Sequence, residues 1–218
     1  MKKVIKIIGV LIALAVVGVI CVFFFLGSIV KKGVETVGPK VTKTEVKLDG
    51  ATLSLFSGSG ELKGFLVGNP EGFKSPAAIK VGSTAVQVQP GSVMSSKVVV
   101  RSVKLVAPEI TLEATLSGNN LTKLLDNIKG SAEKDKQATT KKEQSSSKKL
   151  QVDDFLITGA KVQGSAMGWS GTVPIPDIHL TNLGQGENGI TAAELSEKVF
   201  AELVQSTLKA VAEKGGGT

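Results

Sequence analysis

Cysteine and histidine are nearly missing from this sequence, and tyrosine is missing entirely. The 218 residues include one Cys, one His, one Trp and no Tyr. A single cysteine excludes intramolecular disulfides, so a folded domain must be stabilised by its core alone. Metal sites with several His ligands and Cys–His nucleophilic pairs are excluded as well. We therefore expect no metal, no cofactor and no enzymatic activity.

Other catalytic patterns are also missing. No glycine-rich phosphate loop of recognised spacing occurs. Asp153 and Asp154 are adjacent, so on a strand they point to opposite faces and cannot work as a pair. His179 lies in an alternating segment and is expected to be an ordinary strand residue. Trp169 is expected to cover the core from a loop, and an interfacial anchor is the alternative.

The positive charge does not form a pattern typical of nucleic-acid binding. The chain carries 26 basic and 19 acidic residues, a formal net charge of +7. Three of the lysines precede residue 7, and residues 129–149 contain seven lysines against three acids. The rest of the chain has 16 residues of each sign. A nucleic-acid binder carries its charge as a stripe with aromatic residues between, so we expect no nucleic-acid partner.

One long apolar run dominates the N-terminal part of the chain. Residues 7–30 are 24 consecutive uncharged residues, and about 20 apolar helical residues cross a bilayer. A cleaved signal peptide has a shorter apolar region and a small-x-small cleavage site, which this run lacks. Ile20 before Cys21 also disfavours cleavage and lipidation at that cysteine. The pattern predicts an uncleaved signal anchor over residues 1–32.

The lysines that flank this run predict its orientation. Lys2, Lys3 and Lys6 precede it, whereas Lys31 and Lys32 follow it. The excess on the N-terminal side favours a cytoplasmic N-terminus in a single-pass protein. Residues 33–214 then form one extracytoplasmic domain.

Periodicity changes from helical to twofold after the run. The helix is expected to continue over residues 31–37 and to end at Gly38 and Pro39. Alternation is clearest at Ile110, Leu112 and Ala114, and it predicts strands with one dry face. Turn signals at residues 49–50, 57–60 and 90–91 predict hairpins and a largely antiparallel sheet.

Later segments add a short helix, a polar loop and further strands. Asn119 or Asn120 is expected to cap a helix that ends at Ile128, with Gly130 as its stop signal. Residues 130–149 lack large apolar side chains, which predicts a disordered loop. Strands are expected at residues 150–157, 160–163 and 173–180, the last at a sheet edge because it contains two prolines.

The C-terminal helix has the strongest local signal. Thr191 and Glu194 have the spacing of a capping box, and Ile190 and Leu195 that of a hydrophobic staple. An apolar stripe follows and is expected to pack on the sheet. The predicted fold class is α+β: a transmembrane helix, a curved and mainly antiparallel sheet, a short mid-chain helix and a C-terminal amphipathic helix.

Short motifs with turn residues recur between the predicted strands: Gly60-Glu61-Leu62, Gly68-Asn69-Pro70-Glu71-Gly72-Phe73, Ala107-Pro108-Glu109-Ile110 and Asn119-Asn120-Leu121. These motifs resemble the N-terminal region of AsmA-like proteins, which are bacterial envelope proteins related to TamB-type bridge proteins. The resemblance implies an inner-membrane anchor, a periplasmic domain and a curved sheet with an apolar groove for lipids. It also implies membrane lipids as partners, with envelope proteins as further ones, and a role in lipid binding, lipid transfer or membrane homeostasis. This chain lacks the further strand repeats that a bridge across the periplasm needs.

Three residues are candidate lipid contacts, namely Phe73, Leu62 and Leu66. An open apolar face would serve lipids, whereas a closed one would suit a protein-interaction or scaffold module with a β-sandwich-like domain. The water-stress and late-embryogenesis sandwiches, which also place an Asn-Pro turn after a strand, are an example of that alternative. A hydrolase would need a pocket with converging carboxylates.

Overall fold

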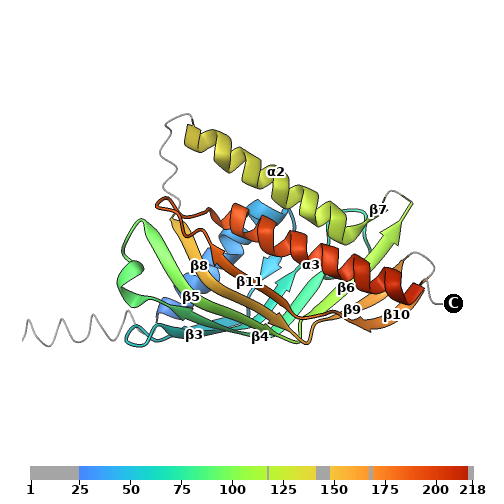
Figure 1. Ribbon diagram of the computed structural model, residues 1–218, viewed down its shortest axis with the longest axis horizontal. Coiled ribbons are helices and arrows are strands. Elements are labelled where there is room, and N and C mark those ends of the chain that lie inside the picture. The colour runs from blue at the N-terminus through green and yellow to red at the C-terminus, as the bar shows by residue number, and fades with distance from the viewer. Residues whose placement is uncertain (1–24, 117, 141–147, 167–168, 216–218) are drawn as a thin grey trace, which may run out of the picture.

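One strongly curled sheet wraps around the helices of this protein. The computed structural model describes residues 25–116, 118–140, 148–166 and 169–215. In Figure 1 the strands form a half-barrel, and α3 (Ala192–Gly215) lies across its concave side. The predicted α+β class, with a curved and mainly antiparallel sheet, is confirmed.

The strands follow one another closely along the chain. Their bounds are β1 Val46–Lys47, β2 Gly50–Leu53, β3 Ser59–Val67, β4 Ile79–Val88, β5 Lys97–Val106, β6 Glu109–Thr115, β7 Gly118–Asn119, β8 Lys149–Thr158, β9 Lys161–Ala166, β10 Trp169–Pro174 and β11 Ile178–Leu183. A short 3-10 helix, η1 (Pro90–Ser92), lies between β4 and β5.

Strand β4 is the branch point of the sheet. One of its edges pairs with β3 in antiparallel register, and β3 also pairs with β1 and β2. Its other edge is shared: Thr84–Val88 pairs with β5, while Ile79 and Lys80 pair with β6. Strands β8 and β9 then add in parallel to β5 and β6. The sheet is therefore mixed, because each parallel partner arrives through a connection longer than a hairpin.

Strands β10 and β11 lie at the two ends of the sheet. The sequence predicts a single strand over residues 173–180, and this prediction is wrong. The chain leaves β10 at Pro174, and β11 starts at Ile178 on β8, on the opposite branch of the sheet. Pro174 and Pro176 lack the N–H that would continue a ladder. The predicted edge position of the segment is confirmed for β10.

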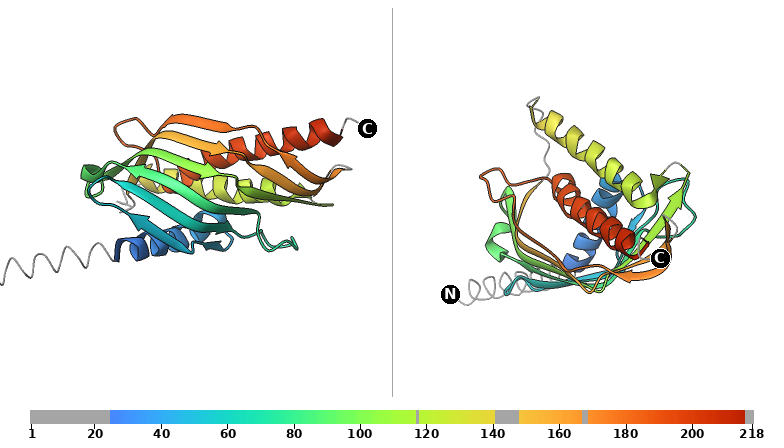
Figure 2. Two further views of the ribbon diagram at one scale, coloured as in Figure 1. Left: turned by 90° about the horizontal axis from the view of Figure 1, so that it is seen from below. Right: turned by 45° about the vertical axis from the view of Figure 1, so that its right-hand side comes forward.

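Helix α3 supplies most of the helical core. Thr191 N–H donates to the Glu194 carboxylate at 2.8 Å, and Glu194 N–H donates to the Thr191 hydroxyl at 3.1 Å, which confirms the capping box. Phe200, Leu203 and Val211 are buried. Figure 2 shows the sheet curling under α3, with α2 (Asn120–Thr140) packed on the side of α3 that faces away from the sheet.

Helix α2 is longer than its sequence signals predict. Asn119 caps it by accepting a hydrogen bond from Thr122 N–H at 2.8 Å, as expected. The predicted end at Ile128 is wrong, since the helix passes Gly130 and runs to Thr140. The predicted loop over residues 130–149 is thus helical as far as Thr140, and residues 141–147 of it lie outside the described part of the chain. Ser131 and Ala132 are buried there, and this tertiary burial outweighs the roughly 1 kcal/mol helix penalty of a glycine.

A further helix over residues 25–42 precedes the sheet. It continues through Gly38 and Pro39, so the prediction that it ends there is wrong. Two side chains of α2 bind the last turn of the residue 25–42 helix. Asn127 donates to Thr42 O at 3.0 Å, and the Ser131 hydroxyl donates to Val41 O at 3.0 Å. These contacts satisfy carbonyls that a helix end leaves without partners.

The predicted anchor lies almost wholly outside the described residues. Only residues 25–30 of the apolar run over residues 7–30 belong to them. Within the described part of the chain, no helix combines the length and the apolar character required for a membrane crossing.

Candidate functional site

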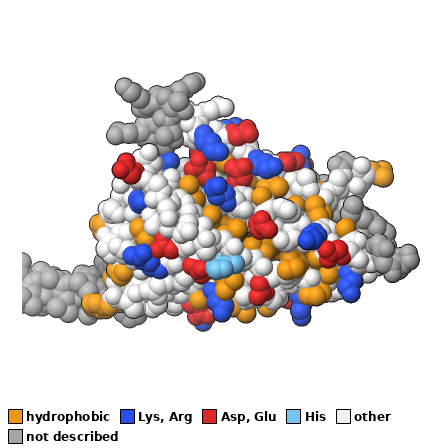
Figure 3. All heavy atoms as spheres, viewed as in Figure 1, with side chains coloured by type: hydrophobic (Ala, Val, Ile, Leu, Met, Phe, Trp, Pro, Cys, Tyr) orange, Lys and Arg blue, Asp and Glu red, His pale blue; other side chains and the backbone are white. Residues whose placement is uncertain are grey.

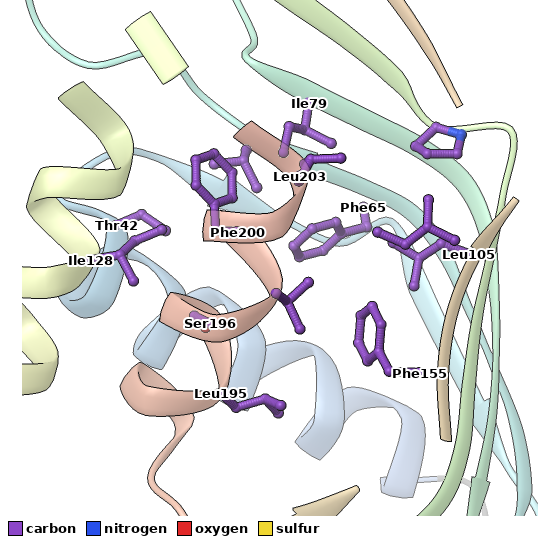
Figure 4. Close-up of a pocket in the computed structure, with 14 residues that line it drawn as sticks. Thr42, Phe65, Ile79, Leu105, Ile128, Phe155, Leu195, Ser196, Phe200 and Leu203 are labelled. Carbon is purple, nitrogen blue, oxygen red and sulfur yellow. The ribbon is translucent and has the colours of Figure 1, made fainter. Parts of the chain in front are cut away.

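An apolar cavity of about 220 Å³ lies between the concave face of the sheet and the helices. In the close-up, Phe65, Leu105 and Phe155 on the strands face α3, whose residues Leu195 to Leu203 form the opposite wall (Figure 4). Thr42 and Ile128 close the side toward the residue 25–42 helix and α2. The lining residues are Thr42, Phe65, Val67, Ile79, Leu105, Pro108, Ile128, Phe155, Ile157, Leu195, Ser196, Val199, Phe200 and Leu203.

The wall of the cavity formed by β3, β5 and β8 results from the alternation of side chains along each strand and from the register between strands. Phe65 and Val67 are two residues apart on β3, so both point to the concave face. Leu105 on β5 is the direct cross-strand partner of Ile157 on β8. Phe155 precedes Ile157 by two residues and joins the same face. The twofold pattern of three separate strands therefore builds one continuous apolar wall.

The wall of the cavity formed by α3 results from the helical spacing of its apolar residues. Leu195, Val199 and Leu203 are spaced by four residues and lie on one face of the helix. Leu203 is buried, whereas Leu195 and Val199 are only half-buried. Across the cavity, Phe65 and Leu105 are half-buried too. The cavity thus communicates with the surface beside the first two turns of α3.

Polar groups contribute almost nothing to this cavity. Among the described residues, Thr42 and Ser196 are the polar members of its lining, and no titratable side chain lines it. The Thr42 hydroxyl already donates to Gly38 O at 3.0 Å. Such a cavity cannot support proton transfer or hold a charged group. It suits an apolar ligand or ligand segment, because any polar ligand atom would lose its hydrogen bonds to water there.

The predicted contact residues Leu62, Leu66 and Phe73 do not line this cavity. Leu62 on β3 is half-buried opposite Thr84. Leu66 lies between the lining residues Phe65 and Val67 on β3, so it points to the opposite face of the sheet, and its cross-strand partners are Lys47 and Lys80. Phe73 is half-buried in a surface depression beside the start of α2. The lining residue Phe65 is one position from Leu66 and lies on the other face of β3, and alternation alone does not indicate which of the two faces is concave.

The carboxylates singled out in the sequence have separate partners. Asp154 Oδ1 lies 2.5 Å from His179 Nε2 in an exposed pair on β8 and β11. Asp153 accepts from Gln151 at 2.7 Å and from Arg101 at 2.8 Å, and these hydrogen bonds hold its pKa below the usual range. The two aspartates do not converge, as the sequence predicts. The described residues also contain no cluster of three or more His, Cys, Asp or Glu residues that could hold a metal.

Charges of both signs are mixed on the surface. Figure 3 shows Lys, Arg, Asp and Glu side chains interspersed over the face that carries His179, with apolar side chains between them. The described residues of this face therefore form no continuous basic stripe of the kind that follows a nucleic-acid backbone.

A polar cluster connects two of the motifs that carry the family resemblance. Asn120 is fully buried and binds Asn69, while the Asn69 amide donates to Ser75 O at 2.7 Å. Glu113 accepts from Lys74 N–H, Ser75 N–H and the Ser75 hydroxyl, and these bonds hold its pKa below the usual range. The cluster lies outside the cavity and anchors the turn at residues 69–75.

Comparison of the chain with models of known protein families and with curated proteins finds no match.

Proposed function

We propose that this protein is a single-pass, membrane-anchored AsmA-like envelope protein that binds lipid acyl chains in the cavity beside α3. Its role is non-enzymatic, in lipid binding, transfer or membrane homeostasis. The observation that carries the proposal is the apolar cavity, because its walls offer burial to hydrocarbon and no chemistry to a polar substrate.

The volume of the cavity limits the size of the ligand that it can hold. A dry cavity of about 150 Å³ accepts benzene, and drug-sized ligands occupy about 300–1,000 Å³. At about 220 Å³, the cavity fits part of one acyl chain and not a whole phospholipid. The headgroup and the rest of the lipid would remain outside, next to the half-buried side chains of Leu195 and Val199.

Helix α3 distinguishes this domain from an open lipid groove. It covers most of the concave face, so a continuous channel along the sheet is closed. A lipid would therefore be held at one place rather than passed along the sheet. This geometry favours capture or hand-over close to the membrane over transport across a periplasm.

The apolar run over residues 7–30 supports a location at a bilayer. Its length matches a hydrocarbon core, and the lysine excess before it favours a cytoplasmic N-terminus. With the AsmA-like motifs, this indicates a bacterial inner membrane with the domain in the periplasm. Membrane lipids are the proposed ligands, envelope proteins are further partners, and no nucleic acid is involved.

The test is binding of a fluorescent fatty acid to the full-length protein in detergent micelles. Val199→Trp places an indole in the cavity, and Val106→Trp places one on an exposed site of β5 as the matched control. We expect the wild type and Val106→Trp to bind alike and Val199→Trp to bind at least about tenfold more weakly, since it loses roughly 1.4 kcal/mol or more of apolar burial.

The unfolding midpoint of each variant is measured alongside, because an overpacked core can be destabilised. Equal binding by a folded Val199→Trp and by the wild type would contradict the proposal. Absence of binding by all three proteins would favour the alternative, a protein-interaction or scaffold module whose apolar face is closed.

A further inference from the structure

Several of the exposed apolar side chains lie at one end of the half-barrel. Phe56, in the β2–β3 hairpin, is 86% exposed, and Met94, in the loop after η1, is 91% exposed. Large apolar residues usually lie inside a protein. Two of them at neighbouring loop tips therefore point to a surface that is covered in the working state.

The sheet topology brings these two loops together. Gly60 on β3 pairs with Val86 on β4, so the β2–β3 hairpin lies beside the end of β4. Val88 N–H donates to Gly58 O at 2.8 Å, and Gln87 donates to Ser57 O at 2.5 Å. The loop that carries Met94 leaves β4 directly after these contacts. Phe56 and Met94 thus belong to one end of the sheet.

The residue 25–42 helix starts at the same end. A Cβ placed on Gly27 would lie 2.0 Å from Ala51 O, so this turn of the helix contacts β2. Phe25 and Ile29 are each 62% exposed on that helix. The chain before residue 25 is the apolar run, which contains no charge from residue 7 onward. Figure 1 shows the first described helical turns at this end of the domain. An anchored chain would therefore bring the bilayer to this end.

Lysines accompany the exposed apolar residues. Lys97 and Lys149 begin the parallel strands β5 and β8, and they are register partners at this end. The Lys148 ammonium donates to Val93 O, next to Met94. The nearby loop between β11 and α3 contributes one carboxylate, Glu187. Amphipathic surfaces of this kind, apolar tips with lysines beside them, bind at the interface of anionic bilayers.

We propose that this end, which we name the proximal end and define by Phe56, Met94, Lys97, Lys148 and Lys149, docks onto an anionic bilayer surface. The inference rests on the anchor in the proposed function. Phe56 and Met94 enter the headgroup region, and the lysines contact lipid phosphates. Because α3 begins at the same end, its first two turns and the cavity opening beside them lie close to the lipids.

The test uses full-length protein reconstituted into vesicles of phosphatidylcholine and phosphatidylglycerol that contain brominated phosphatidylcholine. In a Trp169→Phe background, single tryptophans replace Phe56, Met94 or Leu116. Leu116 is the matched control, because it is fully exposed directly after β6, at the opposite end of the domain. Brominated chains quench only tryptophans that reach the bilayer.

We expect emission of the tryptophans at positions 56 and 94 to fall about twofold relative to unbrominated vesicles, since interfacial side chains lie within about 5–10 Å of the acyl boundary. Emission from position 116 should not change. In vesicles without phosphatidylglycerol the quenching should weaken, because each lysine near an anionic surface contributes about 1 kcal/mol.

Three results would overturn the proposal or a part of it, and they are distinguishable. If the protein floats with the vesicles but positions 56, 94 and 116 are quenched alike, docking of the proximal end is wrong while the anchor stands. If the protein does not float with the vesicles, the anchor is wrong and the docking fails with it. Quenching that is independent of phosphatidylglycerol would overturn the role of the lysines.

Discussion

The buried side chain of Asn120 connects the first residue of α2 to the turn that begins at Asn69. Its amide donates to Asn69 Oδ1 at 2.7 Å and to Thr111 O at 2.8 Å, and its oxygen accepts from Glu113 N–H at 2.9 Å. All of its hydrogen-bonding atoms thus have partners, although it is fully buried. One side chain thereby joins a helix, a strand and a turn that are distant in the sequence.

Substitution Asn120→Ala should destabilise the protein by about 2–4 kcal/mol, because it leaves several buried polar groups without partners. Asn119→Ala is the control, since it removes only the cap of the same helix and should cost about 1 kcal/mol. Chemical denaturation of both variants measures the two costs. Equal costs would contradict the connecting role of Asn120.

The Glu113 carboxylate should make stability depend on pH. Hydrogen bonds from Lys74 N–H and Ser75 lower its pKa in the folded protein, so the ionised form stabilises the fold. This contribution is fully present above the ordinary glutamate pKa of about 4.3 and is lost as the pH falls through the lower folded value.

Denaturation of wild type and Glu113→Gln between pH 7 and pH 3 tests this linkage. We expect the variant to be less stable by about 1 kcal/mol at neutral pH, with the difference shrinking below about pH 4.3. Glu71→Gln, at an exposed position of the same turn, is the control. A difference that stays constant with pH would show that Glu113 acts by packing and not by charge.

Gly164 is required by the parallel contact between β9 and β6. Its φ is +144°, and a Cβ there would lie 1.9 Å from Leu112 O. Gly164→Ala should therefore cost about 2 kcal/mol or more. Gly82, on β4, has no atom within 4 Å of such a Cβ, so Gly82→Ala should change stability by less than about 1 kcal/mol. Thermal unfolding of the two variants checks the contrast, which equal losses would disprove.

Affinity for fatty acids should depend on chain length in a way that reflects the cavity. Each buried methylene contributes about 0.8 kcal/mol, so affinity should rise about fourfold per methylene for short chains. It should level off once the chain extends beyond the cavity of about 220 Å³. Displacement of a fluorescent fatty acid by saturated acids of increasing length measures this profile. A flat profile in the wild type would exclude the cavity as the acyl site.

Several strands and the start of the last helix were predictable from local pattern, whereas the single strand predicted over residues 173–180 is two strands on different partners. Ile110 and Leu112 alternate with polar residues, and both are fully buried on β6. Thr191 and Glu194 form the capping box that their spacing indicates. Local signals wrongly predicted helix ends at Gly130 and at Pro39. Contacts between α2 and the residue 25–42 helix keep the chain helical at both positions. Such contacts depend on residues about 90 positions away in the sequence.

The candidate site was predictable in kind but not in its residues. An apolar concave face was expected, and an apolar cavity lies there. The sequence predicts contacts at Leu62, Leu66 and Phe73, whereas Phe65, Phe155 and Phe200 line the cavity. Alternation identifies which residues of a strand share a face, but not which face is concave, and a register shift by one residue exchanges the two.

The sequence by itself determined the local features: alternating strands, the capped C-terminal helix, the scarcity of cysteine and histidine, and the uncharged run over residues 7–30. Each depends on the chemistry of side chains that are neighbours along the chain. Only the tertiary structure decided that β8 and β9 add in parallel, that β10 and β11 occupy different edges and that α3 fills the concave face. Strand order and helix docking depend on burial between distant segments. For that reason the cavity and the proximal end become visible only when the chain is folded.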